Sequence, residues 1–221
     1  VKTFSGVLEL EFSRIQFTLD LMPSDIVGTE ILDEDGAGSK RFKFLKGPVF
    51  ANMILADEIN RTPPKTQSAL LEAMQEHKVT AGGVSYSLEE PFFVLATQNP
   101  IEQEGTYPLP EAQLDRFMYN VWLGYPSVND EIEIVKRTTG VGLHNVQPIF
   151  HREEIIDFQD LVRKVPVSDE LMKYAVEVVN KTRPESPSSP QFVKDYIRWG
   201  AGPRASQYLI LGAKALAAIE G

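Results

Sequence analysis

Short apolar runs separated by polar stretches indicate several strands in the first part of the chain. The runs Met53–Ala56 and Phe92–Thr97 are almost continuously apolar. Such runs are typical of strands buried on both faces of a parallel sheet that is covered by helices. Two further runs predict strands at Phe12–Phe17 and Met118–Leu123. We therefore expect a parallel sheet with helices on both sides.

The segment between Met53–Ala56 and Phe92–Thr97 predicts a helix at Thr62–Glu76. Thr62 suits the N-cap, and the proline that follows it suits the first helical position. Leu70, Ala73 and Met74 then fall on one face of the helix. Strand, helix and strand in this order form a βαβ unit, so the sequence predicts an α/β fold.

Two segments interrupt this alternation. Lys78–Ser87 has short polar and apolar alternations on either side of Gly82-Gly83, a pattern that predicts a β-hairpin. The stretch Leu21–Phe50 is rich in Gly, Asp and Pro and predicts an insertion with short strands. We place these short strands at Phe42–Leu45 and Val49–Phe50.

Beyond Pro126 the pattern becomes helical. Ser127 and Asp130 resemble a capping box at the start of one helix. We predict an α/β core at residues 1–126 and a small all-helical domain at residues 127–221. Further helices are expected at His151–Lys164, Ser168–Lys181, Gln191–Trp199 and Arg204–Ile219.

The composition excludes several classes of protein. With 43% apolar and 24% charged residues among 221, the chain is an ordinary globular protein. Its 22 Lys and Arg against 31 Asp and Glu give a net charge of −9, and there is no basic run. We therefore expect no nucleic-acid partner, because binding to phosphates needs clustered cations. No run approaches the roughly 20 apolar residues of a membrane span, and the absence of cysteine fits a reducing compartment. We expect a cytoplasmic protein.

Polar side chains follow two of the predicted strands. Asp57 and Glu58 come directly after Met53–Ala56, and Asn99 follows the next buried strand. Sheets of α/β proteins place their ligands at this carboxyl edge. Asp57 would hold a nucleotide's Mg²⁺ mostly through water, and Glu58 would polarise the water that attacks the γ-phosphate. Asn99 would hold that water or a phosphate oxygen.

Simpler explanations exist for each of these residues. A strand that leaves the core can begin its exposed part with acidic residues by chance, because short motifs have a high false-positive rate. Asn99 can also belong to an Asx-type turn before Pro100.

Two arginines are further candidates. Arg116 follows Asp115 just before a predicted strand, where it would reach the γ-phosphate bound by a neighbouring subunit. The alternative for Arg116 is a surface salt bridge, which contributes little stability. Arg204 follows Pro203 in the first turn of a predicted helix. A cation there opposes the helix dipole, so a role facing phosphate fits better than a structural one. The alternative for Arg204 is an ordinary surface arginine.

Taken in order, these motifs resemble those of the MoxR-type AAA+ ATPases. The resemblance covers nearly the whole chain, and five motifs in sequence are far more specific than any one of them. Two positions depart from the usual pattern, since residue 19 is Leu rather than Pro and residue 202 is Gly where Ser is common. The segments that carry the resemblance are Arg14–Asp25, Phe42–Arg61, Ala96–Glu102, Glu111–Phe117 and Gly200–Gln207.

The resemblance implies a P-loop NTPase core with a helical lid, and ATP and Mg²⁺ as cofactors. It implies that Asp57 is the Walker B acid on the metal side and that Glu58 is the catalytic glutamate. Asn99 matches sensor 1, Arg116 the arginine finger and Arg204 sensor 2.

The resemblance also implies a homo-oligomeric ring, usually a hexamer, that remodels or activates client proteins. Many members of the family work beside a partner with a von Willebrand factor A-type domain. The sequence contains no Gly-x-x-x-x-Gly-Lys-Ser/Thr loop, whose backbone N–H groups cradle phosphates. Two interpretations therefore stay open: an ATP-driven remodelling enzyme, and a catalytically inactive scaffold or regulatory module. A DNA-acting relative is disfavoured by the negative charge.

Overall fold

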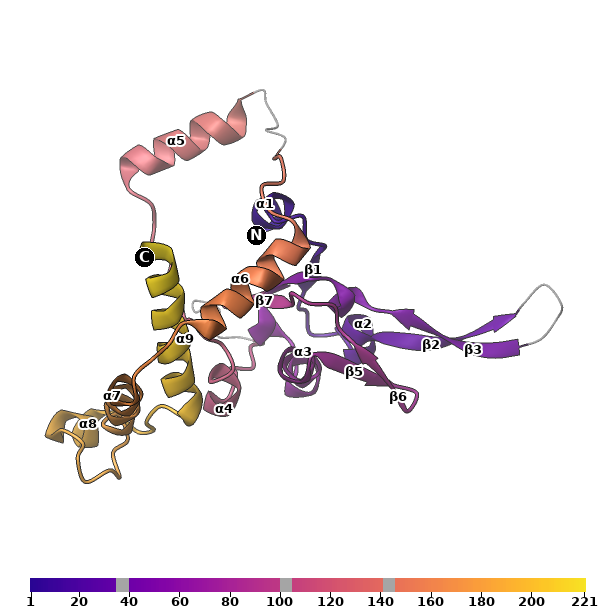
Figure 1. Cartoon of the computed structure of the whole chain (residues 1–221). Coiled ribbons are helices and arrows are strands. Elements are labelled where there is room, and N and C mark those ends of the chain that lie inside the picture. Colours follow the sequence, from indigo (N-terminus) through magenta and orange to yellow (C-terminus); the bar gives the residue numbers. More distant parts are fainter. Residues whose placement is uncertain (35–39, 100–104, 141–145) are drawn as a thin grey trace.

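A parallel three-stranded sheet lies at the centre of the α/β part. The structure is a computed structural model and describes residues 1–34, 40–99, 105–140 and 146–221. The strands β1 (Phe12–Gln16), β4 (Met53–Asp57) and β7 (Phe93–Ala96) are arranged in the order β1-β4-β7. Figure 1 shows α3 (Pro64–Glu76) beside this sheet. The predicted α/β fold with a parallel sheet is confirmed.

The core forms where α3 packs on the sheet. Ile54 and Ala56 of β4 are fully buried, and so are Leu70 and Leu71 of α3. These four side chains belong to one apolar cluster. Burying a large aliphatic side chain stabilises the fold by roughly 1.5–3 kcal/mol. The apolar run of β4 therefore both forms the strand and fixes α3 against it.

Helix α3 begins one residue later than the sequence predicts, at Pro64. Its N-cap is Pro63, and Thr62 is not the cap. Thr62 is instead fully buried and donates its hydroxyl to the backbone carbonyl of Thr18, which lies just after β1. The threonine therefore ties the start of α3 to the loop after β1, a long-range contact that local sequence does not reveal.

Gln67 anchors α3 to two loops. Its side chain is fully buried. The amide nitrogen donates toward the carbonyl oxygens of Ile59 at 3.2 Å, Thr62 at 3.0 Å and Tyr107 at 2.8 Å. Buried carbonyl groups need such donors, because an unpaired buried polar group is costly. Gln67 thereby holds the loop after β4 and the loop before α4 on the same helix.

The predicted insertion contains a long antiparallel hairpin. After α2 (Pro23–Val27), the strands β2 (Gly28–Glu34) and β3 (Lys40–Lys46) pair with each other and project from the core (Figure 1). The strand expected at Phe42–Leu45 lies inside β3. The strand expected at Val49–Phe50 is wrong, because Pro48–Phe50 forms a 3-10 helix that begins at the proline and buries Val49.

The second hairpin is confirmed. The strands β5 (Lys78–Ala81) and β6 (Val84–Ser87) pair antiparallel. Gly82 and Gly83 both have positive φ, at 57° and 79°. Two left-handed residues in a row suit the tight turn that the glycine pair predicts.

Beyond Pro126, the regular elements of the described residues are helices. Ser127 caps α5, since its hydroxyl accepts a hydrogen bond from the Asp130 amide at 3.3 Å. The Asp130 carboxylate accepts from the same hydroxyl at 2.6 Å, which differs from the reciprocal bond to the backbone that a capping box has. None of the described helices is long and apolar enough to cross a bilayer. The division at residue 126 stays a prediction. The helices beyond Pro126 are α5 (Val128–Thr139), α6 (Arg152–Lys164), α7 (Asp169–Asn180), α8 (Gln191–Tyr196) and α9 (Pro203–Glu220). Before Pro126 the chain also forms α1 (Lys2–Val7), which the sequence analysis missed, a 3-10 turn at Ile59–Arg61, and α4 (Glu111–Leu114).

The strand predicted at Met118–Leu123 is wrong. The segment has no regular secondary structure, and Trp122 and Leu123 are 82% and 92% exposed. A strand exists only where a neighbouring strand accepts its hydrogen bonds. Within the described ranges, no strand pairs with this segment, so its apolar pattern has no sheet to join.

We predict that Gln67→Glu lowers the free energy of unfolding by about 3 kcal/mol, because a carboxylate in this buried position faces carbonyl oxygens that need a donor. Urea denaturation followed by circular dichroism measures the change. Gln75→Glu is the matched control, since Gln75 lies on the exposed face of the same helix. Equal destabilisation by the two variants would contradict the anchoring role of Gln67.

Candidate functional site

Two acidic residues stand at the carboxyl end of the central strand. Asp57 is the last residue of β4, and Glu58 follows it. Because the sheet is parallel and in register, Gln16 of β1 lies beside Asp57, and Ala96 of β7 lies beside Ala56. The strand ends therefore bring residues from three distant parts of the sequence to one edge. The sequence analysis expected the parts after β4 and β7 there, but not the part from β1.

The Asp57 carboxylate is bonded on both oxygens. The Thr97 hydroxyl donates to Oδ1 at 2.6 Å. The Arg14 guanidinium donates to Oδ2 from Nη2 at 2.5 Å and from Nε at 3.0 Å. Both contacts, with the Thr97 hydrogen bond the stronger cause, lower the pKa of Asp57 from its usual value. The carboxylate therefore stays charged throughout the neutral range.

Glu58 is held through both its backbone and its side chain. Its backbone is left-handed, with φ 56° and ψ 48°, and its amide donates to the Thr97 hydroxyl at 2.9 Å. The carboxylate oxygen Oε2 accepts from Gln16 Nε2 at 3.1 Å and from Arg61 Nη1 at 3.0 Å. A left-handed backbone is costly for a residue other than glycine and is common at functional sites. This conformation makes Glu58 a strong candidate for a functional residue.

Asn99 lies two residues beyond Thr97, past the end of β7, and is half-buried. Its neighbours Pro100 and Glu102, which contribute to the family resemblance, lie outside the described residues. The chain therefore brings Asn99 to the same end of the sheet as Asp57 and Glu58.

We call the group around the two acids the carboxylate cluster. Sequence reasoning missed four of its members, which lie on β1, on the turn after β4 and just after β7. Arg14 and Gln16 alternate along β1 and so share one face. Two long polar side chains on either side of the buried Ile15 are the signal that could have found these two residues. The cluster consists of Arg14, Gln16, Asp57, Glu58, Arg61 and Thr97.

The cluster fits a Mg²⁺ ion that is held mainly by other ligands. Within the described part of the chain, no three His, Asp or Glu side chains come together to form a metal cage. Mg²⁺ in nucleotide sites usually has one or two carboxylates, several waters and the phosphates. Asp57, with a hydroxyl beside it, supplies a charged oxygen of this kind.

The two predicted arginines belong to a second group, which we call the arginine cluster. Arg204 stands in the first turn of α9, and its Nη1 lies 3.2 Å from Oδ2 of Asp115. The Tyr208 hydroxyl donates to the backbone carbonyl of Arg116 at 3.0 Å. A Cβ atom at Gly202 would lie 3.0 Å from both carboxylate oxygens of Asp115, so glycine there leaves room for the ion pair. The arginine cluster consists of Asp115, Arg116, Gly202, Arg204 and Tyr208.

Both arginines have surroundings that the sequence did not predict. Asp115 offsets the unfavourable position of Arg204 at a helix N-terminus, so Arg204 has a structural partner as well as a candidate functional role. Arg116 is half-buried, and its Nε atom is buried without a hydrogen-bond partner. A buried donor without a partner is unusual and calls for an explanation.

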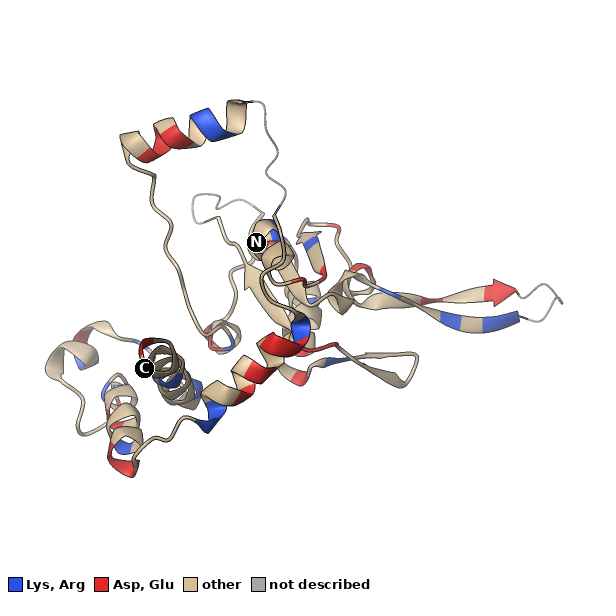
Figure 2. Ribbon diagram, turned by 45° about the horizontal axis from the view of Figure 1, so that its top comes forward, with Lys and Arg blue, Asp and Glu red and all other residues tan. Residues whose placement is uncertain are grey.

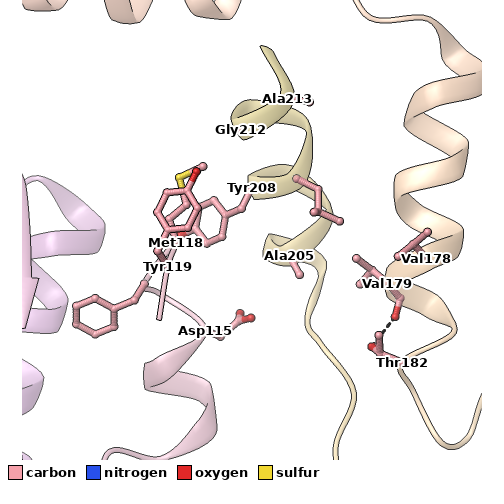
Figure 3. A pocket seen from close by; sticks show the side chains of 12 residues that line it. Asp115, Met118, Tyr119, Val178, Val179, Thr182, Ala205, Tyr208, Gly212 and Ala213 are labelled. Carbon is pink, nitrogen blue, oxygen red and sulfur yellow. Dashed lines mark hydrogen bonds between the residues drawn. The ribbon is translucent and has the colours of Figure 1, made fainter. Parts of the chain in front are cut away.

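An open pocket of about 580 Å³ adjoins the arginine cluster. Figure 3 shows it between the loop after α4 and the helices α7 and α9, with Asp115, Tyr119 and Tyr208 among its labelled side chains. Of the described residues, none from the carboxylate cluster lines this pocket. The structure therefore places the predicted site residues in two groups: Asp57 and Glu58 at the strand ends, and Arg116 and Arg204 beside the pocket.

Comparison with known proteins identifies a family and several relatives. Residues 1–119 match the model of the "ATPase family associated with various cellular activities (AAA)". The chain is 46% identical over 221 residues to Chaperone MoxR1 of Mycobacterium tuberculosis and 44% identical to the uncharacterized protein YeaC of Bacillus subtilis. All of this chain is covered in both comparisons, whereas it spans 58% and 65% of those relatives.

A solved structure extends the likeness to three dimensions. The crystal structure of a protein from Cytophaga hutchinsonii matches 98% of this chain with a TM-score of 0.88 and 46% sequence identity. The match covers 65% of that protein. The family match, the fold and the sequence identity thus agree, and the chain belongs to the MoxR-type AAA ATPase family.

Proposed function

We propose that the complete protein binds and hydrolyses ATP and uses the energy to remodel, assemble or activate client protein complexes. The observation that carries the proposal is the pair of strand-end acids, Asp57 and Glu58, held by β1 and by Thr97. Because the chain spans only part of its relatives, the activity is proposed for the complete protein.

Asp57 is proposed to hold the Mg²⁺ of the nucleotide through water. Its lowered pKa supports this role, because the carboxylate is charged before any ligand arrives. Bound Mg²⁺ would neutralise charge that develops on the phosphates. The Arg14 guanidinium balances the same carboxylate and is proposed to keep it oriented.

Glu58 is proposed as the general base that accepts a proton from the attacking water. Gln16 and Arg61 both donate to Oε2, which supports a fixed position for the carboxylate and leaves Oε1 for the water. Asn99 is proposed to orient the same water or a phosphate oxygen. Gln16 is a positioning residue, since it acts through Glu58.

Arg116 and Arg204 are proposed to act on the phosphates at a subunit interface. Arg116 of one subunit would stabilise the transition-state charge in the site of its neighbour, as an arginine finger does. Arg116 is half-buried, so part of its side chain is open to a neighbouring molecule. The ion pair of Asp115 with Arg204 links the finger segment to the first turn of α9, so the two arginines would move together.

The assembly is proposed to be a homo-oligomeric ring, with hexamers expected from the family resemblance. The relative from Mycobacterium tuberculosis is named a chaperone, which supports a protein client. A partner with a von Willebrand factor A-type domain and a cytoplasmic location are proposed on the same resemblance.

For Glu58→Gln in the complete protein we expect ATP turnover to fall at least about 100-fold while Mg²⁺-dependent ATP binding persists, because a general base contributes this much to proton transfer. Phosphate release and titration of a fluorescent ATP analogue measure the two quantities. Glu72→Gln, on an exposed position of α3, is the control. Unchanged turnover refutes the base assignment, and absence of ATP binding in the unaltered protein favours the inactive scaffold.

For Gln16→Ala we expect kcat to fall about ten- to hundredfold with little change in KM or melting temperature, because a misplaced base reacts poorly although the nucleotide still binds. Steady-state kinetics and calorimetry measure these quantities. Gln75→Ala on α3 is the matched control. A loss of melting temperature without a selective loss of kcat would mean that Gln16 is only structural.

For Arg116→Ala we expect a fall in kcat of about a thousandfold or more, the usual effect of removing an arginine finger. Mixed assemblies test whether the arginine acts in trans. Subunits with Arg116→Ala keep Glu58, and subunits with Glu58→Gln keep Arg116, so mixing them should restore part of the turnover. Arg137→Ala, an exposed residue of α5, is the control. Co-assembly without restored turnover counts against the trans role.

A further inference from the structure

The hairpin of β2 and β3, which we call the insert hairpin, is an isolated two-stranded sheet. Each strand has seven residues, and the two strands pair only with each other among the strands of the described residues. A ribbon of two strands is marginally stable in water and gains stability from further strands. Both of its edges also present backbone N–H and C=O groups that can pair with another strand.

The base of the insert hairpin is fixed to the core. The Phe44 ring stacks on Tyr86 of β6 with centroids 4.4 Å apart, and it meets Phe50 edge-on at 5.9 Å. The Glu30 carboxylate lies against Gly82 in the turn of the second hairpin. These contacts fix the direction in which the hairpin projects (Figure 1). Its outer part is therefore presented to other molecules in a defined orientation.

Large apolar side chains of the hairpin are exposed to solvent. Leu32 and Phe42 are opposite each other across the two strands and are 57% and 75% exposed. Ile31 and Leu45 are exposed on the opposite face. Apolar side chains on both faces of one projecting ribbon are a common sign of an interaction surface. A strand from another molecule that paired with the hairpin would cover part of these exposed apolar side chains.

The two edges carry opposite charge, as Figure 2 shows with red on one strand and blue on the other. All charged residues of β2 are acidic, and all charged residues of β3 are basic. Part of the charge is balanced inside the hairpin, since Lys43 Nζ lies 3.5 Å from Asp33 Oδ2 and the register places Asp33 opposite Arg41 and Glu34 opposite Lys40. The acidic residues are Glu30, Asp33 and Glu34, and the basic residues are Lys40, Arg41, Lys43 and Lys46.

This charge pattern selects one way of pairing two hairpins. Pairing of β2 with β2, or of β3 with β3, would place like charges side by side and is therefore unfavourable. Pairing of β2 from one copy with β3 from another brings opposite charges together. The two strands are antiparallel in the hairpin, so hairpins that project in the same direction can join antiparallel into one continuous sheet.

We propose that the insert hairpins of neighbouring copies of this chain associate edge to edge, with the acidic β2 of one copy against the basic β3 of the next. Such a contact uses different surfaces on the two partners, so it can be repeated from copy to copy. The inference goes beyond the proposed function, because no nucleotide and no residue of the carboxylate cluster takes part in it.

An opposing explanation gives the opposite outcome. Proteins place charged residues on edge strands to prevent pairing with other chains. If the charges here prevent pairing, reversing the charges of one strand does not weaken the association of two copies. Removing the charges then increases self-association. Under our proposal, reversing the charge of one edge makes every hairpin repel its own copies.

Three variants test the proposal in the 221-residue chain. In the acidic-hairpin variant, Lys40→Glu and Arg41→Glu give both strands negative charge. In the basic-hairpin variant, Asp33→Lys and Glu34→Lys give both strands positive charge. Glu30 is left unchanged because it contacts Gly82. The control carries Lys136→Glu and Arg137→Glu on α5, which changes the net charge by the same amount as the acidic-hairpin variant at a helix far from the hairpin (Figure 1).

Sedimentation velocity at low salt measures self-association. We expect the dissociation constant of each hairpin variant alone to rise at least about tenfold, because two attractive cross-strand pairs become repulsive. The α5 control should associate like the unaltered chain, and high salt should weaken the unaltered contact. An equimolar mixture of the acidic and basic variants should associate again, which also shows that both variants are folded.

Carbodiimide coupling gives a second readout, because it joins a carboxylate to an amine in direct contact. In a mixture of isotope-labelled and unlabelled chains, we expect products that join Asp33 or Glu34 of one copy to Lys40 or Lys43 of the other. Stronger association of either variant alone, equal loss in the α5 control, or a mixture that stays monomeric would overturn the proposal. Products confined to single chains would do so as well.

Discussion

The hydroxyl of Thr97 connects the two strands that define the site. It donates to the Asp57 carboxylate at 2.6 Å and accepts from the Glu58 amide at 2.9 Å. The backbone adds two links around it, since Thr97 N–H donates to the Ala56 carbonyl at 2.9 Å and Ile59 N–H donates to the Thr97 carbonyl at 3.0 Å. Because a single residue after β7 fixes the Asp57 carboxylate and the Glu58 backbone at the end of β4, the sheet and the carboxylate cluster cannot be altered independently.

The second part of the site depends on different physics. The arginine cluster is held by an ion pair and one tyrosine hydroxyl between the segment after α4 and the first turns of α9. Both side chains of the ion pair are partly exposed to solvent, so the pair contributes little stability by itself. The carboxylates are thus held rigidly by a sheet edge, whereas the arginines are held by contacts that a ligand or a neighbouring subunit can replace. This difference suits a site that is completed only when subunits meet.

Local patterns predicted the parts of the fold that depend on local physics. The continuous apolar run of β4 and the Gly82-Gly83 turn each specify an element without help from distant residues. Thr62 was misassigned because its buried hydroxyl bonds to Thr18, far away in sequence. Met118–Leu123 has the pattern of a strand but finds no partner strand in the described part of the chain. The apolar pattern of a segment specifies which side chains it would bury. Whether the segment forms a strand depends on a neighbouring strand that pairs with it.

The same distinction applies to the candidate site. Asp57 and Glu58 could be found because they directly follow a buried strand. Gln16 and Arg14 could not be assigned to them without the register between β1 and β4, which no single sequence reveals. Arg204 was judged a poor structural residue because its partner, Asp115, lies 89 positions earlier.

The left-handed backbone at Glu58 has a consequence for how substitutions at this position are interpreted. β-Branched residues such as valine or threonine are strongly disfavoured in that region of φ and ψ. Replacing Glu58 with such a residue would tend to rotate the peptide between residues 57 and 58. That rotation would move the Glu58 amide, which donates a hydrogen bond to the Thr97 hydroxyl. Such a variant would lose the geometry of both acids at once. A side chain of unchanged shape removes only the acid, so isosteric and branched replacements at this position report on two different properties of the protein.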